Sequence, residues 1–213
     1  MNFKKNIVSF LLAALLIIFS YLFLDARFSL FVRTTFKLNA HLHIFFANIP
    51  DVLLPVVCAI TVLAWTAYFT LSHKGIYSNH TRFVLLVANS IPLTFILELI
   101  LKHVVGRINT RYWLLHPTAR EFHWFQGYGN YAGFPSGHMA VFTALVIALW
   151  TYYPRYRFAY FIFLSVLALA LLATNYHFLS DIIAGAYLGM VVHAGTLRGL
   201  MVSEKSKEWN EVV

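Results

Sequence analysis

Six long apolar runs alternate with short polar segments along the chain. Each run has about the 20 residues that an α-helix needs to cross the hydrocarbon core of a bilayer. An α-helix also pairs its backbone polar groups within itself, as a lipid environment requires. The chain is therefore predicted to be all-α: a polytopic membrane helical bundle of six transmembrane helices, in one membrane-embedded domain over residues 1–213. The predicted spans cover residues 7–24, 52–71, 82–101, 136–153, 158–174 and 179–197.

Two of the segments between the runs differ from short polar loops. Residues 25–43 mix Arg27, Arg33 and Lys37 with phenylalanines, a composition typical of an amphipathic segment in the membrane interface. Residues 102–135 are irregular and rich in glycine and aromatic side chains. We expect this second segment to form an outer loop that carries the active site.

Composition agrees with a membrane protein and excludes other classes. Hydrophobic residues make up 60% of the 213 residues and charged residues 11%, against roughly 45–50% and 25% in soluble domains. The formal net charge of +8 comes with no basic stripe and no RNA-binding aromatic motif, so no nucleic-acid partner is predicted. A single cysteine, Cys58, excludes an intrachain disulfide.

Basic residues near the ends of the runs indicate the orientation. Six spans place both termini on one side, and the short loops on that side are nearly all basic. The positive-inside rule then favours cytoplasmic N- and C-termini. In this orientation three span ends, near Lys102, Ser136 and His177, gather on the outer face. The inner segments hold Lys4, Lys5, Lys74, Arg82, Arg155, Arg157, Arg198, Lys205 and Lys207.

The stretch Ser136-Gly137-His138 opens the fourth run. Unpaired amide N–H groups and the helix dipole make a helix N-terminus a binding site for an anion. The imidazole of His138 adds a group that can give or take a proton near neutral pH. Taken alone, Ser136 could instead cap the helix, since serine is a favoured N-cap residue.

Two further span ends carry residues that complete this chemistry. His177 and Asp181 open the sixth run four residues apart and so share one face of a helix. The carboxylate can hold the proton on one imidazole nitrogen, which leaves the other nitrogen as a nucleophile. Lys102, Arg107 and Arg111 follow the third run and supply cations. Two histidines that face each other among cations and helix N-termini suit in-line transfer of a phosphoryl group.

These motifs, in this order, resemble those of the type 2 phosphatidic acid phosphatase family. The similarity extends over residues 82–197 and consists of a Lys…Gly-Arg motif, a Pro-Ser-Gly-His motif and a His-x-x-x-Asp motif. It implies a metal-independent membrane phosphatase that works through a phospho-histidine and needs no cofactor. In that mechanism His177 would be the nucleophile, Asp181 its orienting partner and His138 the general acid. The residues implied to bind the phosphate are Lys102, Arg107, Ser136 and Gly137.

The sequence departs from the family pattern in two places. The first motif usually has an Arg-Pro pair where this chain has Asn109 and Thr110, and the third usually has an arginine where it has Leu171. A transition state with spread negative charge needs such cations. Among the other arginines of the outer loop, we expect Arg111, better placed than Arg120, to compensate.

Glu98 lies four residues before Lys102, and an acid near the end of a span is costly unless it is paired. A Glu–Lys pair on one helix face is therefore predicted, which either tunes the lysine or only solvates it. The remaining histidines lack the spacing of metal ligands, so no metal site is predicted. Two small-residue pairs permit close helix packing, within the bundle or in a dimer: Gly185 with Gly189 and Gly195 with Gly199.

The leading hypothesis is a membrane lipid phosphatase that hydrolyses a lipid phosphate or diphosphate monoester at the membrane surface. A site at span ends suits a substrate whose headgroup lies at the interface while its tail stays in lipid. A lipid phosphotransferase with the same His-His-Asp core is one alternative, and a non-catalytic lipid-binding or transport protein is a second. The expected location is a bacterial inner (plasma) membrane, with the site on the periplasmic side.

Overall fold

The computed structural model describes residues 3–35 and 52–210, and most of these residues are helical. The longer helices are α1 (Phe3–Phe19), α2 (Asp25–Thr35), α4 (Leu53–His73), α5 (Asn79–Val105), α7 (Gly137–Tyr152), α8 (Arg157–Ala173) and α9 (Leu179–Asn210). The shorter ones are the π-helix η1 (Ser20–Leu24), α6 (Thr110–Leu115) and the 3₁₀ turns η3 (Gly129–Tyr131) and η4 (Pro154–Tyr156). No β-strand occurs within the described ranges, where one isolated bridge joins Arg107 to Phe122. The all-α prediction is confirmed.

Within the described ranges, five helical segments are long and apolar enough to span a membrane. They are Asn6–Thr35, Pro55–His73, Asn79–Val105, Pro154–Ala173 and Leu179–Val202. The remaining predicted span corresponds to α7, which has 16 residues. At 1.5 Å per residue it rises about 24 Å, less than the roughly 30 Å of a hydrocarbon core. A polytopic helical bundle is thus confirmed, with α7 shorter than the other spans.

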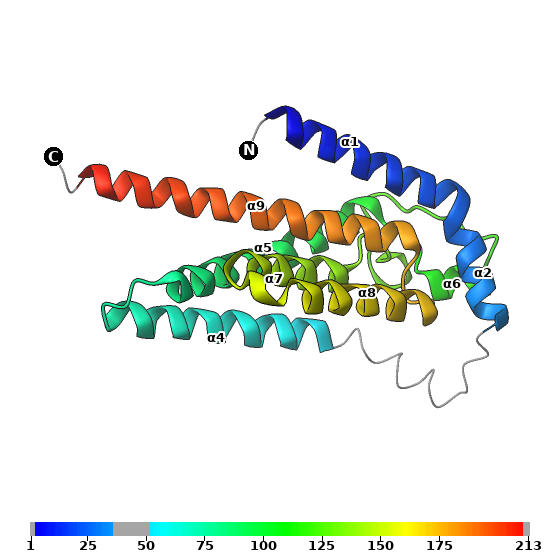
Figure 1. Ribbon diagram of the computed structural model, residues 1–213. Helices are drawn as coiled ribbons and strands as arrows, with labels where there is room; N and C mark the ends of the chain where they lie inside the picture. The colour runs from blue at the N-terminus through cyan, green and yellow to red at the C-terminus, as the bar shows by residue number, and fades with distance from the viewer. Residues whose placement is uncertain (1–2, 36–51, 211–213) are drawn as a thin grey trace.

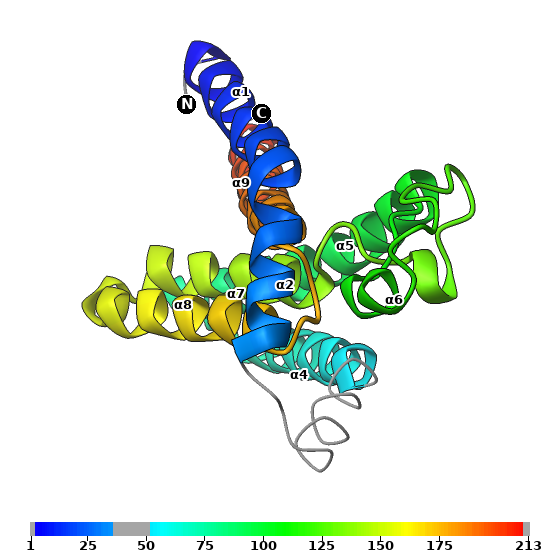
Figure 2. The ribbon, with the colours of Figure 1, turned by 90° about the vertical axis from the view of Figure 1, so that its right-hand side faces the viewer.

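The helices α5, α7 and α9 pack against one another and form the centre of the bundle (Figures 1 and 2). The outer helices are α4, which packs on α5, α8, which packs on α7, and α1, which packs on α9. Their outward faces expose large apolar side chains such as Leu15, Leu63 and Phe161. Extended apolar surfaces of this kind are typical of contact with lipid.

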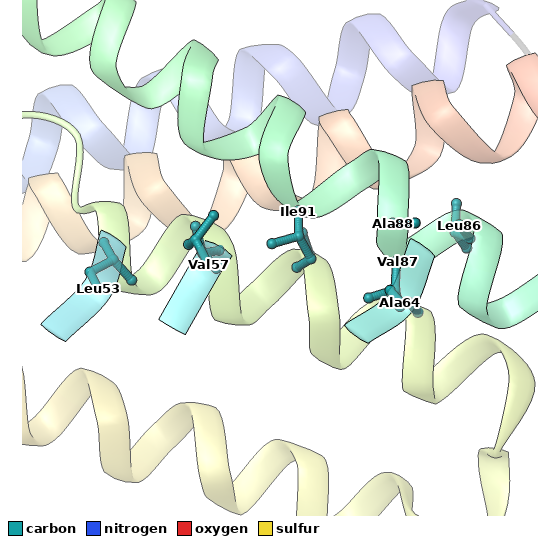
Figure 3. Packing of buried hydrophobic residues seen from close by; sticks show 10 residues of the cluster. Leu53, Val57, Ala64, Leu86, Val87, Ala88 and Ile91 are labelled. Atoms are coloured by element: carbon teal, nitrogen blue, oxygen red, sulfur yellow. The ribbon is translucent and has the colours of Figure 1, made fainter. Parts of the chain in front are cut away.

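One apolar cluster fills the space between α4, α5 and α7 (Figure 3). Leu86, Ala88 and Ile91 of α5 are fully buried in it, against Val57 of α4 and Val141 of α7. Dense packing of this kind leaves little freedom for one helix to slide along another. The cluster therefore holds α4, α5 and α7 in one arrangement.

Two glycines allow α9 to lie directly against α7. A Cβ atom at Gly185 would lie 2.4 Å from the carbonyl oxygen of Ser136, and one at Gly189 would lie 2.3 Å from that of Ala140. No side chain fits at these distances, so this glycine pair packs within the bundle. At Gly195, by contrast, a Cβ would meet no atom within 4 Å.

The first helix continues through Leu24, where the sequence predicted the end of a span. The residues on both sides of η1 keep right-handed helical dihedral angles, so α1 passes through η1 into α2. The polar face of α2 is buried at Asp25 and Ser29, because α2 packs on α6, α8 and α9 across the end of the bundle where α9 begins (Figure 2). The predicted interfacial segment of residues 25–43 is thus helical as far as Thr35, and its residues 36–43 lie outside the described residues.

Replacing Gly189 with alanine is expected to destabilise the protein, because the added methyl group must separate α9 from α7. Overpacking of this kind costs about 1–3 kcal/mol. Gly195→Ala is the matched control, since alanine in open space favours a helix by up to about 1 kcal/mol. Thermal unfolding in detergent should give a lower Tm for Gly189→Ala and an equal or higher Tm for Gly195→Ala. Two variants of equal Tm would contradict the close helix contact.

Candidate active site

Three segments that are distant in sequence meet at the end of the bundle beside α6. They are the end of α5, the start of α7 and the residues just before α9. The Ser136 amide donates a hydrogen bond to the carbonyl oxygen of Asp181 at 3.0 Å, which ties α7 to the first turn of α9. A Cβ at Gly137 would lie 2.6 Å from Glu98 Oε1, so glycine at this position permits the close approach of α5. The fold therefore brings the three predicted motifs to one place.

A cavity of about 360 Å³ opens where these segments meet. Two cations, Lys102 and Arg111, line it together with the imidazole of His177 and the ring of Tyr176. The other lining residues are Asn109, Tyr112, Gly129, Asn130 and Ala132. Guanidinium and ammonium groups that converge on one cavity form a binding site for a phosphate-like anion.

His177 is 4% exposed and lies beside Asp181. The predicted common helix face is wrong, because α9 begins at Leu179 and His177 lies in the turn before it. Its Nδ1 is 3.7 Å from Asp181 Oδ2, longer than a direct hydrogen bond, so the interaction is electrostatic. Burial lowers the pKa of His177, and Lys102 lowers it further, while Asp181 and the backbone of Gly133 oppose the shift. The imidazole is therefore neutral at pH 7, as a nitrogen nucleophile must be.

Asp181 is completely buried, and both of its carboxylate oxygens have partners. Oδ1 accepts a hydrogen bond from Arg107 Nη1 at 2.5 Å, and Oδ2 accepts one from the Phe178 amide at 3.0 Å. These contacts fix the plane of the carboxylate, with Oδ2 on the side of His177.

Arg107, expected to bind phosphate, does not line the cavity. It is 3% exposed, and besides Asp181 it donates to Ser180 Oγ at 2.6 Å and to Asp25 Oδ2 at 2.7 Å. Burial alone would lower the pKa of Arg107, but Asp181 and Asp25 raise it above its usual value, so the guanidinium stays charged. The side chain thus joins a carboxylate of α2 to one of α9.

Asp25 and Ser180 are members of this site that the sequence analysis did not single out. The Ser180 amide donates to Asp25 Oδ1 at 3.0 Å, and its hydroxyl donates to Asp25 Oδ2 at 2.5 Å. A signal for Asp25 was present, because a carboxylate next to an apolar run is costly unless it is paired. The same argument predicted the pair of Glu98 and Lys102, which is present with Oε1 2.6 Å from Nζ.

Arg111 lies against the turn that precedes His177. Its Nε and Nη2 both donate to the carbonyl oxygen of Thr174 at 3.2 Å, and its guanidinium lies 5.1 Å from the centre of the Tyr176 ring. Burial lowers the pKa of Arg111 from its usual value, an effect that Tyr176 opposes. Leu171, where the family pattern has an arginine, is buried in an apolar cluster. Arg111 thus supplies a cation close to the segment in which that arginine is missing.

The Ser-Gly-His motif lies behind the cavity rather than in its wall. Ser136 and His138 are buried at the start of α7, and Ser136 Oγ accepts a hydrogen bond from the Met139 amide at 3.4 Å. The rings of His138 and Tyr176 meet edge-on with their centres 5.8 Å apart, and those of Tyr176 and His177 with their centres 4.9 Å apart. Tyr176 thus contacts both histidines.

A family model described as the PAP2 superfamily matches residues 83–203, more than half of the chain. The chain belongs to the PAP2 superfamily, and the resemblance read from its motifs is confirmed. Membership indicates a phosphatase-type hydrolase. Comparisons with curated proteins and with solved structures gave no match. Within the described ranges, no group of three or more His, Cys, Asp or Glu side chains could hold a metal ion.

His177 is expected to titrate below the ordinary histidine value of about 6.5, because burial opposes its charged form. The unfolded chain then binds the proton more tightly, so the free energy of unfolding falls as the pH drops from about 6.5 to the pKa of the folded state. NMR of histidine-labelled protein measures this pKa, with His177→Asn to assign the signal. A titration at or above 6.5 would contradict the burial of a neutral imidazole.

Proposed function

We propose that the protein is a membrane lipid phosphatase that hydrolyses a lipid phosphate or diphosphate monoester through a phospho-histidine intermediate. The observation that carries the proposal is the cavity in which Lys102, Arg111 and a buried, neutral His177 meet. Cations beside an unprotonated imidazole suit nucleophilic attack on a phosphoryl group. Membership of the PAP2 superfamily supports the same class of reaction.

In this proposal Lys102 and Arg111 bind the phosphate. The planar guanidinium of Arg111 can hold two phosphate oxygens at once, and Lys102 adds a second charge. The start of α7, with Ser136 and Gly137, adds the positive end of a helix dipole from behind the cavity. A phosphate-binding role for Arg107 has less support, because its terminal nitrogens are bonded to carboxylates.

The reaction would proceed in two steps: formation of a phospho-histidine on His177, and then its hydrolysis. Since Nδ1 of His177 faces Asp181, we assign the proton to Nδ1 and the attacking lone pair to Nε2. Nε2 forms a bond to phosphorus while the bond to the lipid oxygen breaks, and His138 protonates that oxygen. Water then attacks the phospho-histidine, gives a proton to His138 and releases phosphate. His138 meets the ring of Tyr176 edge-on, and Tyr176 lines the cavity.

An apolar groove supports a lipid as the substrate. It has a volume of about 780 Å³, runs between α1 and α9, and begins at Leu179, two residues after His177. Leu12, Ile182 and Met139 are among its lining side chains. A hydrocarbon tail in this groove would keep the phosphate near the start of α9.

The proposed orientation places the cavity on the outer face of a plasma membrane. From the side of α6, α1 runs back toward its start and α9 runs toward its end, so the start of α1 and the end of α9 both point away from α6 (Figure 1) and both termini would be cytoplasmic. The basic residues Lys74, Arg155 and Arg157 would then lie on the inner side, in agreement with the positive-inside rule.

Purified protein in detergent is expected to release phosphate from a panel of lipid phosphates with chelator present. His177→Asn should reduce release to background, because it removes the nucleophile while retaining a side chain of similar size. His103→Asn is the matched control, since His103 is exposed on the last turn of α5 and should keep wild-type activity. Wild-type release by His177→Asn would contradict the proposal. Label transferred to a second lipid, without free phosphate, would indicate a phosphotransferase instead.

Arg111→Ala is expected to lower kcat/KM by about 10²–10³, the usual loss when one group that stabilises transition-state charge is removed. Arg120→Ala is the control, since Arg120 is exposed in the same outer loop. Steady-state kinetics on one lipid phosphate compares the two. Equal activity of both variants would show that Arg111 does not replace the missing family arginines.

A further inference from the structure

We infer that Asp25 is a positioning residue for the reaction: acting through Arg107 and Ser180, it fixes the orientation and the charge of the Asp181 carboxylate that faces His177. The inference rests on the proposed function of His177 as the nucleophile.

Asp25 holds the first turn of α9 from another helix. Its two oxygens accept the amide and the hydroxyl of Ser180, at 3.0 and 2.5 Å, and Nη2 of Arg107, at 2.7 Å. The first amides of a helix have no partner within the helix, so a carboxylate at this position stabilises the helix end. Ser180 directly precedes Asp181, so Asp25 restrains the backbone that carries the carboxylate.

Arg107 transmits this restraint and cannot turn into the cavity without leaving several contacts. One terminal nitrogen binds Asp181 and Ser180, and the other binds Asp25. The guanidinium also lies over aromatic rings, at 4.5 Å from the centre of Phe178 and 5.2 Å from that of Tyr21. These hydrogen bonds and ring contacts hold the guanidinium of Arg107 in one orientation.

The charges of Asp25, Arg107 and Asp181, here called the charged cluster, matter as much as their geometry. Asp25 and Asp181 are buried and share one guanidinium, so the charged cluster keeps one net negative charge beside His177. An imidazole that attacks phosphorus becomes positively charged, and this negative charge stabilises it. With Asp25 neutral, Arg107 would compensate Asp181 alone, and that stabilisation would be lost.

The other groups around His177 come from three helices and from the turn before α9. Lys102 of α5 lines the same cavity and lowers the pKa of His177, while Tyr176 contacts His177 from the turn before α9. Arg111 and His138 contact Tyr176, from α6 and α7 respectively. Among the neighbours of His177, Asp181 is the acid that lies beside it. Arg107 partly neutralises Asp181, so a change in how Arg107 is shared between Asp25 and Asp181 changes the negative charge next to His177.

The test is Asp25→Asn, which retains the shape of the side chain and removes its charge. We expect kcat on a lipid phosphate to fall by about 10–100-fold, by analogy with the loss typical of groups that orient a metal-binding histidine. KM should stay within about twofold, because Lys102 and Arg111 are unchanged. The acidic limb of the pH profile of kcat/KM should move to lower pH, because the imidazolium of His177 is less stabilised.

Two further variants separate positioning from folding. Ser180→Ala keeps both charges and removes one hydroxyl, so it should lower kcat without moving the acidic limb, and it provides a test even if Asp25→Asn does not fold. Glu121→Gln is the matched acid control, because Glu121 accepts its hydrogen bond from Tyr21 and not from Arg107 or Ser180, which bind Asp25. It should keep the wild-type profile.

The outcomes distinguish this inference from the proposed function. Activity in His177→Asn would contradict the proposed function itself. If His177→Asn is inactive while Asp25→Asn and Ser180→Ala keep the kcat and pH profile of the wild type, the role of Asp25 is overturned alone. A lower Tm for Asp25→Asn with unchanged kinetics would also overturn it, since it would show a structural role only.

Discussion

The two buried salt bridges of Arg107, one to each of two carboxylates, fix the geometry of the site. One carboxylate, Asp25, comes from α2 near the start of the chain, and the other, Asp181, from α9 near its end. All three groups are buried, and removing one partner of a buried pair costs roughly 3–5 kcal/mol because a charge is left uncompensated. The arginine therefore holds α2, α9 and the segment after α5 in one arrangement, which places Asp181 beside His177.

The fold could be predicted because lipid imposes simple rules on the chain. A long apolar run in a bilayer must be a helix, so the runs located the helices α4, α5, α8 and α9. The helix ends that differ from the prediction depend on tertiary contacts. The helix that begins with α1 does not end at Leu24, because Asp25 is buried and its carboxylate binds Arg107 and Ser180. In the same way α5 continues past Leu101 to Val105, where its last turn carries Lys102.

The site could be predicted only where its residues form local motifs. The spacing of Glu98 and Lys102 on one helix can be read from the sequence. The spacing of His177 and Asp181 also indicated that they are neighbours, although His177 lies in the turn before α9 and only Asp181 is on the helix. The binding of Arg107 to a buried carboxylate could not be predicted, because its partner Asp25 lies 82 residues away in the chain. No local pattern distinguishes an arginine that binds a buried carboxylate from one that binds a phosphate, and only the packing of α2 decides between them.

The proposed mechanism requires a covalent phosphate on His177, and this intermediate can be trapped. The protein would be mixed rapidly with a lipid phosphate labelled with ³²P, quenched in alkali, in which phospho-histidine is stable, and digested to locate the label. We expect label on the peptide that contains His177, formed and lost at the rate of turnover and absent from His177→Asn. Turnover without label on that peptide, or label on His138 instead, would contradict the proposed mechanism.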